Sequence, residues 1–199
     1  MITIEEFKTR CITQSVEEIV DEIILANGAL HVSENNVSHM QGSLARAYGI
    51  SSDDIALRIV GSAKLGFSIT EKKKTGVHYP RYRLFSPESD IDTAVVSPRL
   101  YRIIWEELSI YSHSQVWFPW KSGRLGDYML CGWLRPDYFP KGIRLRSCDL
   151  WWDQFRRFSG DLRFERRSVR GGLFNSMEDL ERYSQRSVKE CVILEREIL

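Results

Sequence analysis

The sequence predicts a small α/β (α+β) protein with a mixed β-sheet flanked by helices and a helical lead-in at the N-terminus. Residues 55–60 and 91–96 are short apolar runs bounded by turn residues, which is typical of strands. Ser15 and Ser176 are each followed three positions later by an acid, the capping-box pattern that opens a helix. With 199 residues, 43% of them hydrophobic, the chain can bury one substantial core.

In the first half, helical periodicity follows Ser15 and stops at Asn27-Gly28. A second helix is expected over roughly residues 36–48, and the strand at 55–60 comes next. Residues 71–89 are polar, basic and contain proline, so they predict a loop between two strands.

In the second half, the strand at 91–96 is closed by Ser97-Pro98, and the proline opens a helix. The later elements are expected in this order: short strands and turns over 115–152, a short helix at 149–158, a strand at 161–167 and a final helix capped at Ser176. The expected organisation is a helical lead-in at residues 1–52, packed on one compact unit at residues 53–199.

Charge and composition limit the function classes. The net charge is +1, from 28 basic and 27 acidic side chains, so no long-range field draws the chain onto nucleic acid or a membrane. A signal peptide and a membrane-spanning apolar stretch are both missing from the sequence, which predicts a cytoplasmic protein. The cysteines lack the close pairs of a zinc or redox motif and are expected to be reduced; they are Cys11, Cys131, Cys148 and Cys191.

A glycine- and serine-rich segment, residues 59–68, directly follows the first predicted strand. Small residues at a strand end let backbone N–H groups approach phosphate oxygens, and a hydroxyl adds one more donor. The candidate nucleotide-binding residues are Gly61, Ser62, Lys64, Gly66 and Ser68. The alternative is a glycine-rich turn that binds no ligand.

Asp90 and Asp92 lie two residues apart at the start of the second strand, so their side chains share one face. Two like charges this close repel each other, and a cation relieves the repulsion. Mg²⁺ prefers such carboxylate oxygens, shared with substrate phosphates. The alternative is a solvent-facing edge strand with acidic tips.

Together, the two motifs resemble those of the DNA polymerase beta-like nucleotidyltransferase superfamily. Its pattern is a strand, Gly-Ser, a short turn ending in glycine, and a strand with Asp-x-Asp. The matching residues are Gly61, Ser62, Gly66, Asp90 and Asp92, and the resemblance covers about residues 55–110.

The resemblance implies that Ser62 and nearby backbone hold the triphosphate of ATP or GTP, while Asp90 and Asp92 bind Mg²⁺. It also implies in-line attack on the α-phosphate with release of pyrophosphate. The acceptor stays open between an RNA end, a protein and a small molecule.

The interval between Gly61 and Asp90 is longer than in compact members of the superfamily. This basic insertion is expected either to cover the nucleotide or to contact an acceptor such as RNA over residues 72–83. Its side chains suit phosphate oxygens; they are Lys72, Lys73, Lys74, Arg81 and Arg83. A solvated hairpin tip explains the same charges.

The superfamily usually has a third carboxylate on a later strand. Glu165 is the first candidate for it and Asp161 the second, although the neighbouring arginines also offer ion-pair partners. Several aromatic residues are candidates for a base-stacking platform or for the core: Trp117, Trp120, Trp133, Tyr138, Trp151 and Trp152.

Two functions of different class follow from these patterns. The first is an Mg²⁺-dependent nucleotidyltransferase. The second is a catalytically degenerate relative that acts as a regulatory or binding subunit with an operon-encoded protein partner, in a toxin–antitoxin or phage-defence system. A helix-turn-helix over residues 34–52 is a third hypothesis, and the neutral charge argues against it.

Overall fold

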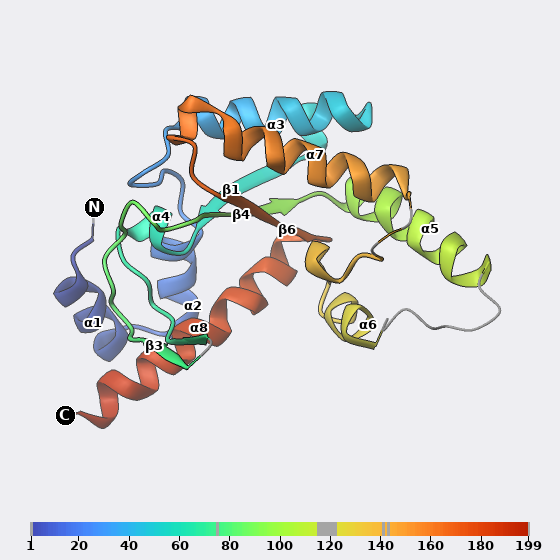
Figure 1. Ribbon diagram of the computed structural model, residues 1–199. Coiled ribbons are helices and arrows are strands. Elements are labelled where there is room, and N and C mark those ends of the chain that lie inside the picture. Colours follow the sequence, from blue (N-terminus) through green and yellow to red (C-terminus); the bar gives the residue numbers. More distant parts are fainter. Residues whose placement is uncertain (1, 75, 115–122, 141, 143, 199) are drawn as a thin grey trace.

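The computed structural model describes residues 2–74, 76–114, 123–140, 142 and 144–198. Within them, helices surround a four-stranded mixed sheet and a separate hairpin, so the predicted α/β class is confirmed (Figure 1). The α-helices are α1 (Ile4–Thr13), α2 (Val16–Ile19), α3 (Glu34–Tyr48), α4 (Ser62–Leu65), α5 (Pro98–Ser114), α6 (Gly123–Met129), α7 (Arg146–Gly160) and α8 (Met177–Glu197). The strands are β1 (Ala56–Val60), β2 (Lys72–Lys74), β3 (Val77–Tyr79), β4 (Ile91–Val96), β5 (Trp133–Leu134) and β6 (Val169–Phe174).

The four-stranded sheet has the order β1-β4-β6-β5. Strand β4 is antiparallel to β1 and parallel to β6, and β5 is antiparallel to β6. Both strands predicted from apolar runs are confirmed, as β1 and β4. In their register Val60 lies opposite Asp92, so the end of β1 meets the start of β4.

One face of the sheet is closed by α3, α5 and α7 (Figure 1). Ile91 and Val95 of β4 and Leu173 of β6 point to this face, where they are buried with Trp151 of α7 and Met40 of α3. Because side chains alternate along a strand, the residues between them point to the other face.

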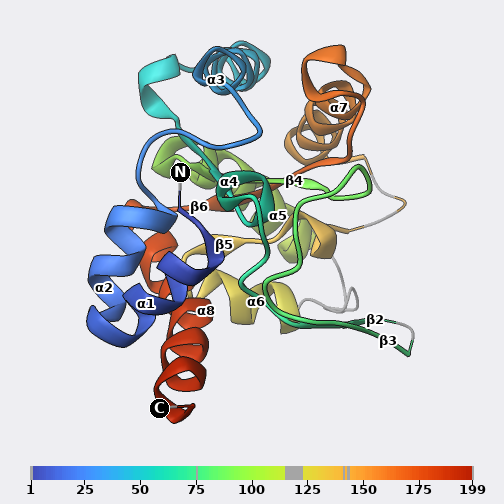
Figure 2. The same cartoon turned by 90° about the vertical axis from the view of Figure 1, so that its left-hand side faces the viewer.

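Helix α8 crosses the second face, with α1 and α2 packed against it (Figure 2). Ala94 and Phe174 of the sheet are buried here with Phe7 of α1 and Val188 of α8. The predicted capping box at Ser15 is present, but its helix continues as a π-helical turn over Val20–Ile24. The predicted cap of α8 at Ser176 is also present.

The helices of residues 1–52 are divided between the two faces. Helices α1 and α2 pack against α8, whereas α3 packs against β1 and α7. Helix α1 had no counterpart among the elements expected from the sequence. The domain boundary at residue 52 stays a prediction.

The predicted strand at 161–167 is wrong. Residues Leu162–Phe164 form a 3-10 turn, which Asp161 caps by accepting a hydrogen bond from the backbone N–H of Arg163. Glu165 and Arg166 then have φ values of 54° and 55°, a left-handed conformation that a strand does not contain. The strand starts only at Val169, as β6.

Three further predictions need correction. The segment at 71–89 is not a loop throughout, because β2 and β3 pair as an antiparallel hairpin. The described part of 115–152 contains helix α6 and the first turns of α7 as well as the short β5. Helix α3 is followed by a 3-10 turn at Ser52–Asp54 and by β1, so no second helix of a helix-turn-helix follows it.

Among the helices that the structure describes, none has both the length and the apolar character of a bilayer-spanning segment.

Candidate functional site

Gly61 makes the turn between β1 and α4 in a conformation that favours glycine. Its φ is 65° and its ψ is −148°, a region that residues with a side chain rarely adopt. A Cβ atom built at this position would lie 3.3 Å from Oδ2 of Asp92. The turn is therefore closely fitted to the start of β4.

Asp90 and Asp92 lie at the start of β4. Asp92 is half-buried, and among the described residues its carboxylate accepts no hydrogen bond and forms no ion pair. Burial raises the pKa of Asp92; Lys72 and Arg170 oppose the rise and the Asp90 charge adds to it. A carboxylate with few local donors is destabilised in its charged form, which a bound cation would correct.

Arg170 of β6 stands beside the acidic pair. It is the register partner of Asp92 in the parallel β4–β6 ladder, and its Nη2 lies 3.2 Å from Oδ2 of Asp90. The Asp90 side chain is 35% exposed and the Arg170 side chain 65% exposed, so the ion pair is open to solvent. Arg170 was not predicted as a site residue, because the two glycines that follow it weaken the strand pattern.

A cavity of about 700 Å³ opens on this part of the sheet. The residues around the predicted motifs that line it are Gly61, Lys64, Ser68, Lys72, Asp92 and Arg170. The structure thus brings four of the predicted site residues to one cavity, together with one lysine of the hairpin and the unpredicted Arg170. Ser62, Gly66 and Asp90 are not among its described lining residues.

Ser62, Gly66 and Ser68 hold the shape of the turn. Ser62 is the first residue of α4 and is half-buried. Gly66 ends the helix at φ 87°, and a Cβ there would lie 2.6 Å from Cδ2 of Leu30. The buried Ser68 hydroxyl donates to the carbonyl oxygen of Thr70 at 3.1 Å.

Lys64 is a buried lysine whose ammonium is already occupied. Its Nζ donates to the backbone carbonyls of Ala26, Asn27 and Gly28, and the Asn27 contact is 3.3 Å. Desolvation lowers the pKa of Lys64, and the Glu34 charge opposes this effect. Any contact of Lys64 with phosphate competes with its attachment to the loop before α3, and its nucleotide-binding role stays a prediction.

The candidates for a third carboxylate are engaged elsewhere. Oε2 of Glu165 lies 2.9 Å from Nη2 of Arg167, and Oδ2 of Asp161 lies 2.8 Å from Nη1 of Arg163. Neither acid lies on a strand. Within the described residues, no three His, Cys, Asp or Glu side chains form a group that would hold a metal ion by themselves.

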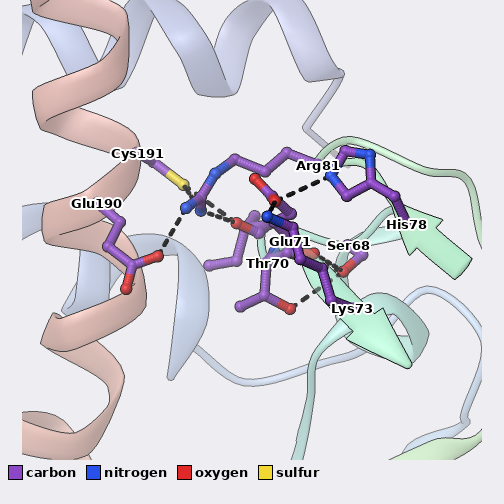
Figure 3. Close-up of polar contacts among 9 residues, drawn as sticks. Ser68, Thr70, Glu71, Lys73, His78, Arg81, Glu190 and Cys191 are labelled. Carbon is purple, nitrogen blue, oxygen red and sulfur yellow. Dashed lines mark hydrogen bonds and ion pairs between the residues drawn. The ribbon is translucent and has the colours of Figure 1, made fainter. Parts of the chain in front are cut away.

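The basic segment forms a hairpin that is attached to α8 (Figure 3). Arg81 donates to the carbonyl oxygen of Ile69 at 2.7 Å and pairs with Glu190 of α8 at 2.6 Å. Glu71 lies between Lys73, at 3.8 Å, and His78, at 2.9 Å. Arg81 is therefore an anchor of the hairpin base, and Lys72 is the hairpin residue that faces the cavity.

The aromatic residues of this region have mixed positions. Trp133, Trp151 and Trp152 all line the cavity, and Trp151 is at the same time buried in the core. The Arg135 guanidinium lies 5.0 Å from the ring centre of Tyr138 and 5.4 Å from that of Trp133. The predicted candidates Trp117 and Trp120 lie outside the described residues. A base-stacking role stays a prediction.

The cysteines Cys11, Cys148 and Cys191 are buried and Cys131 is exposed, all with free thiols. No protein-family model, no curated protein and no solved structure matches this chain. The resemblance to the nucleotidyltransferase superfamily therefore stays a hypothesis.

Proposed function

We propose that the cavity at the start of β4 binds a nucleoside triphosphate as its magnesium complex and transfers its nucleotidyl group to an acceptor. The observation that carries the proposal is the close fit of Gly61 against Asp92, which joins the two motifs at one cavity. The two motifs are 31 positions apart in the sequence, and the antiparallel β1–β4 register brings them together.

The donor set fits Mg²⁺. Asp90 directly precedes β4 and Asp92 lies within it, and Asp92 accepts no hydrogen bond from the described residues. Mg²⁺ is usually bound through one or two carboxylates and completes its octahedron with water and substrate phosphates, so a third acid is not required for binding. When bound, Mg²⁺ would neutralise charge on the attacking and leaving oxygens.

The chain's own residues would position the substrate. Backbone N–H groups around Gly61 and Ser62 would meet phosphate oxygens, and Lys72 and Arg170 would add charge-assisted hydrogen bonds. The exposed Lys72 and Lys73 of the hairpin would meet an RNA acceptor, if the acceptor is RNA. We propose a cytoplasmic location, where ATP and GTP would be available to the site.

A second function, nucleotide binding without turnover, is favoured by a specific observation. The β6 position beside Asp92 holds Arg170, a positively charged side chain and not a third carboxylate, and Glu165 is paired with Arg167 on a turn. A site without a general base for the attacking hydroxyl would bind nucleotide and transmit that state to an operon-encoded partner, as in a toxin–antitoxin or phage-defence system.

The test combines binding and turnover. Calorimetry with non-hydrolysable ATP and GTP analogues, with and without Mg²⁺, would compare the wild type with Asp90→Asn plus Asp92→Asn. Glu106→Gln is the matched control, because it removes one exposed acid that pairs with Arg102 on α5. Incubation with α-phosphate-labelled nucleotides would then detect transfer and pyrophosphate release.

Metal-dependent binding that the double variant loses and the control keeps would support the site. Label transfer or pyrophosphate release would support the transferase, and binding without either would support the regulatory module. Equal binding by the double variant and the wild type would overturn both.

A further inference from the structure

The acidic pair has a built-in positive partner. Arg170 stands directly beside Asp92 across the parallel ladder, and its guanidinium reaches Asp90 at 3.2 Å. The Nε of Arg170 also lies 3.4 Å from the hydroxyl of Ser168, two residues earlier in the chain. The charged group therefore lies alongside the oxygens that a divalent cation would use.

The ion pair is suited to exchange. Exposed pairs between arginine and a carboxylate contribute little to stability, so a competing ligand can separate them. A guanidinium offers a planar set of donors that fits a phosphate as well as a carboxylate. Because Arg170 lines the cavity, a phosphate bound there is within the region that its side chain can sample.

We propose that Arg170 is an exchangeable counter-ion: it neutralises Asp90 in the free protein and moves to a phosphate oxygen when a nucleotide binds. This inference rests on the proposed function. Release of Asp90 then makes its carboxylate free for the divalent cation. Cation binding is therefore weak without nucleotide and strong with it, and Arg170 acts as a positioning residue that couples the two.

The test is a titration with Mn²⁺ followed by electron paramagnetic resonance, first with Mn²⁺ alone and then with a non-hydrolysable ATP or GTP analogue. Three single variants are compared: Arg170→Gln, Lys72→Gln and Arg102→Gln. Lys72→Gln removes a cavity-facing charge that makes no ion pair with Asp90, and Arg102→Gln removes a distant surface charge. Circular dichroism and Tm establish that each variant is folded.

Two opposite changes are expected in Arg170→Gln. Mn²⁺ alone should bind about threefold more tightly, since the competing ion pair is gone. The nucleotide complex should bind at least about tenfold more weakly, since a charge-assisted bond to phosphate is lost. Arg170→Lys keeps the charge without the planar fork, and it should regain part of the nucleotide affinity.

The inference fails if Arg170→Gln leaves the affinity for Mn²⁺ alone unchanged or weakens it. It also fails if Lys72→Gln tightens Mn²⁺ binding equally, because general charge would then control the metal. Absence of nucleotide binding in the wild type would overturn the proposed function. The titration with Mn²⁺ alone would still decide separately whether Arg170 competes for Asp90.

Discussion

The two faces of the sheet are built differently although they share the same strands. On the face covered by α3, α5 and α7, the side chains of β4 and β6 are buried in an apolar cluster. On the face crossed by α8, Ala94 and Phe174 are buried, but Asp92 and Arg170 line a cavity. The alternation of side chains along the two strands thus places Ile91, Val95 and Leu173 in the apolar cluster and Asp92 and Arg170 at the cavity.

The two adjacent glycines of β6 show the same contrast. A Cβ at Gly171 would lie 2.1 Å from Cζ of Phe155, a buried residue of α7. A Cβ at Gly172 would lie 2.6 Å from Nε1 of Trp133, which is half-buried beside the cavity. Both neighbours would have to shift, and the overlap is larger at Gly171 than at Gly172.

The largest effect is expected at the closed face. Leu173 is fully buried in the apolar cluster, so Leu173→Ala should lower the free energy of unfolding by about 2–5 kcal/mol. Urea denaturation followed by circular dichroism measures the change. Leu162→Ala is the control, because Leu162 is 74% exposed and its loss should cost less than about 0.5 kcal/mol. Equal effects would contradict the view that burial in the apolar cluster makes Leu173 important for stability.

The next effect tests the two glycines. Gly171→Ala should cost about 1–3 kcal/mol through overpacking against Phe155, and Gly172→Ala should cost less because its added Cβ overlaps Trp133 by less. Gly126→Ala is a control, since nothing lies within 4 Å of its added Cβ. Denaturation midpoints of the three variants give the order, and a greater loss at Gly172 would reverse the interpretation.

Much of the fold followed from local patterns. The capping boxes and the two apolar runs predicted helices and strands because each signal lies within a few residues. Strand β6 was missed because Gly171 and Gly172 interrupt it, and the reason for the glycines, close packing against Phe155 and Trp133, involves residues distant in sequence.

The candidate site shows the same limit. The Gly-Ser turn and the Asp-Ile-Asp pair were recognised from the sequence, and the register then placed Gly61 against Asp92. The partners of the site were not predictable, because Arg170 reaches Asp90 only through the β4–β6 pairing. Likewise, the attachment of Lys64 to the carbonyls of residues 26–28 depends on how the loop before α3 folds back.

A loss of stability similar to that of Gly171→Ala is expected when Lys64, which lines the cavity, is replaced. Lys64→Met would leave the carbonyls of residues 26–28 without their donor and should destabilise the protein by about 1–3 kcal/mol. Thermal denaturation measures the loss, and Lys72→Met, at an exposed position, should show almost none. If Lys64 is structural, the folded variant keeps its nucleotide affinity within about twofold. Unchanged stability with lost affinity would instead identify Lys64 as a phosphate ligand.

The smallest effect on stability is expected at Asp92, where the sign is informative. Burial raises the pKa of Asp92, so at neutral pH the folded protein holds a charge that it solvates poorly. Asp92→Asn removes that charge and should leave Tm unchanged or raise it, with a change within about 1 kcal/mol. Metal-dependent nucleotide binding should be lost at the same time.

Asp179 is an aspartate that, unlike Asp92, is expected to stabilise the folded protein. It lies in the first turn of α8 and pairs with Arg182 at 3.0 Å, so Asp179→Asn should lower stability by about 0.3–1 kcal/mol. Calorimetric scans of both variants without metal would compare them directly. A loss of Tm in Asp92→Asn as large as that in Asp179→Asn would mean that Asp92 stabilises the fold. The argument that Asp92 serves to bind a ligand would then fail, because that argument requires that the Asp92 charge does not stabilise the folded protein in the absence of a ligand.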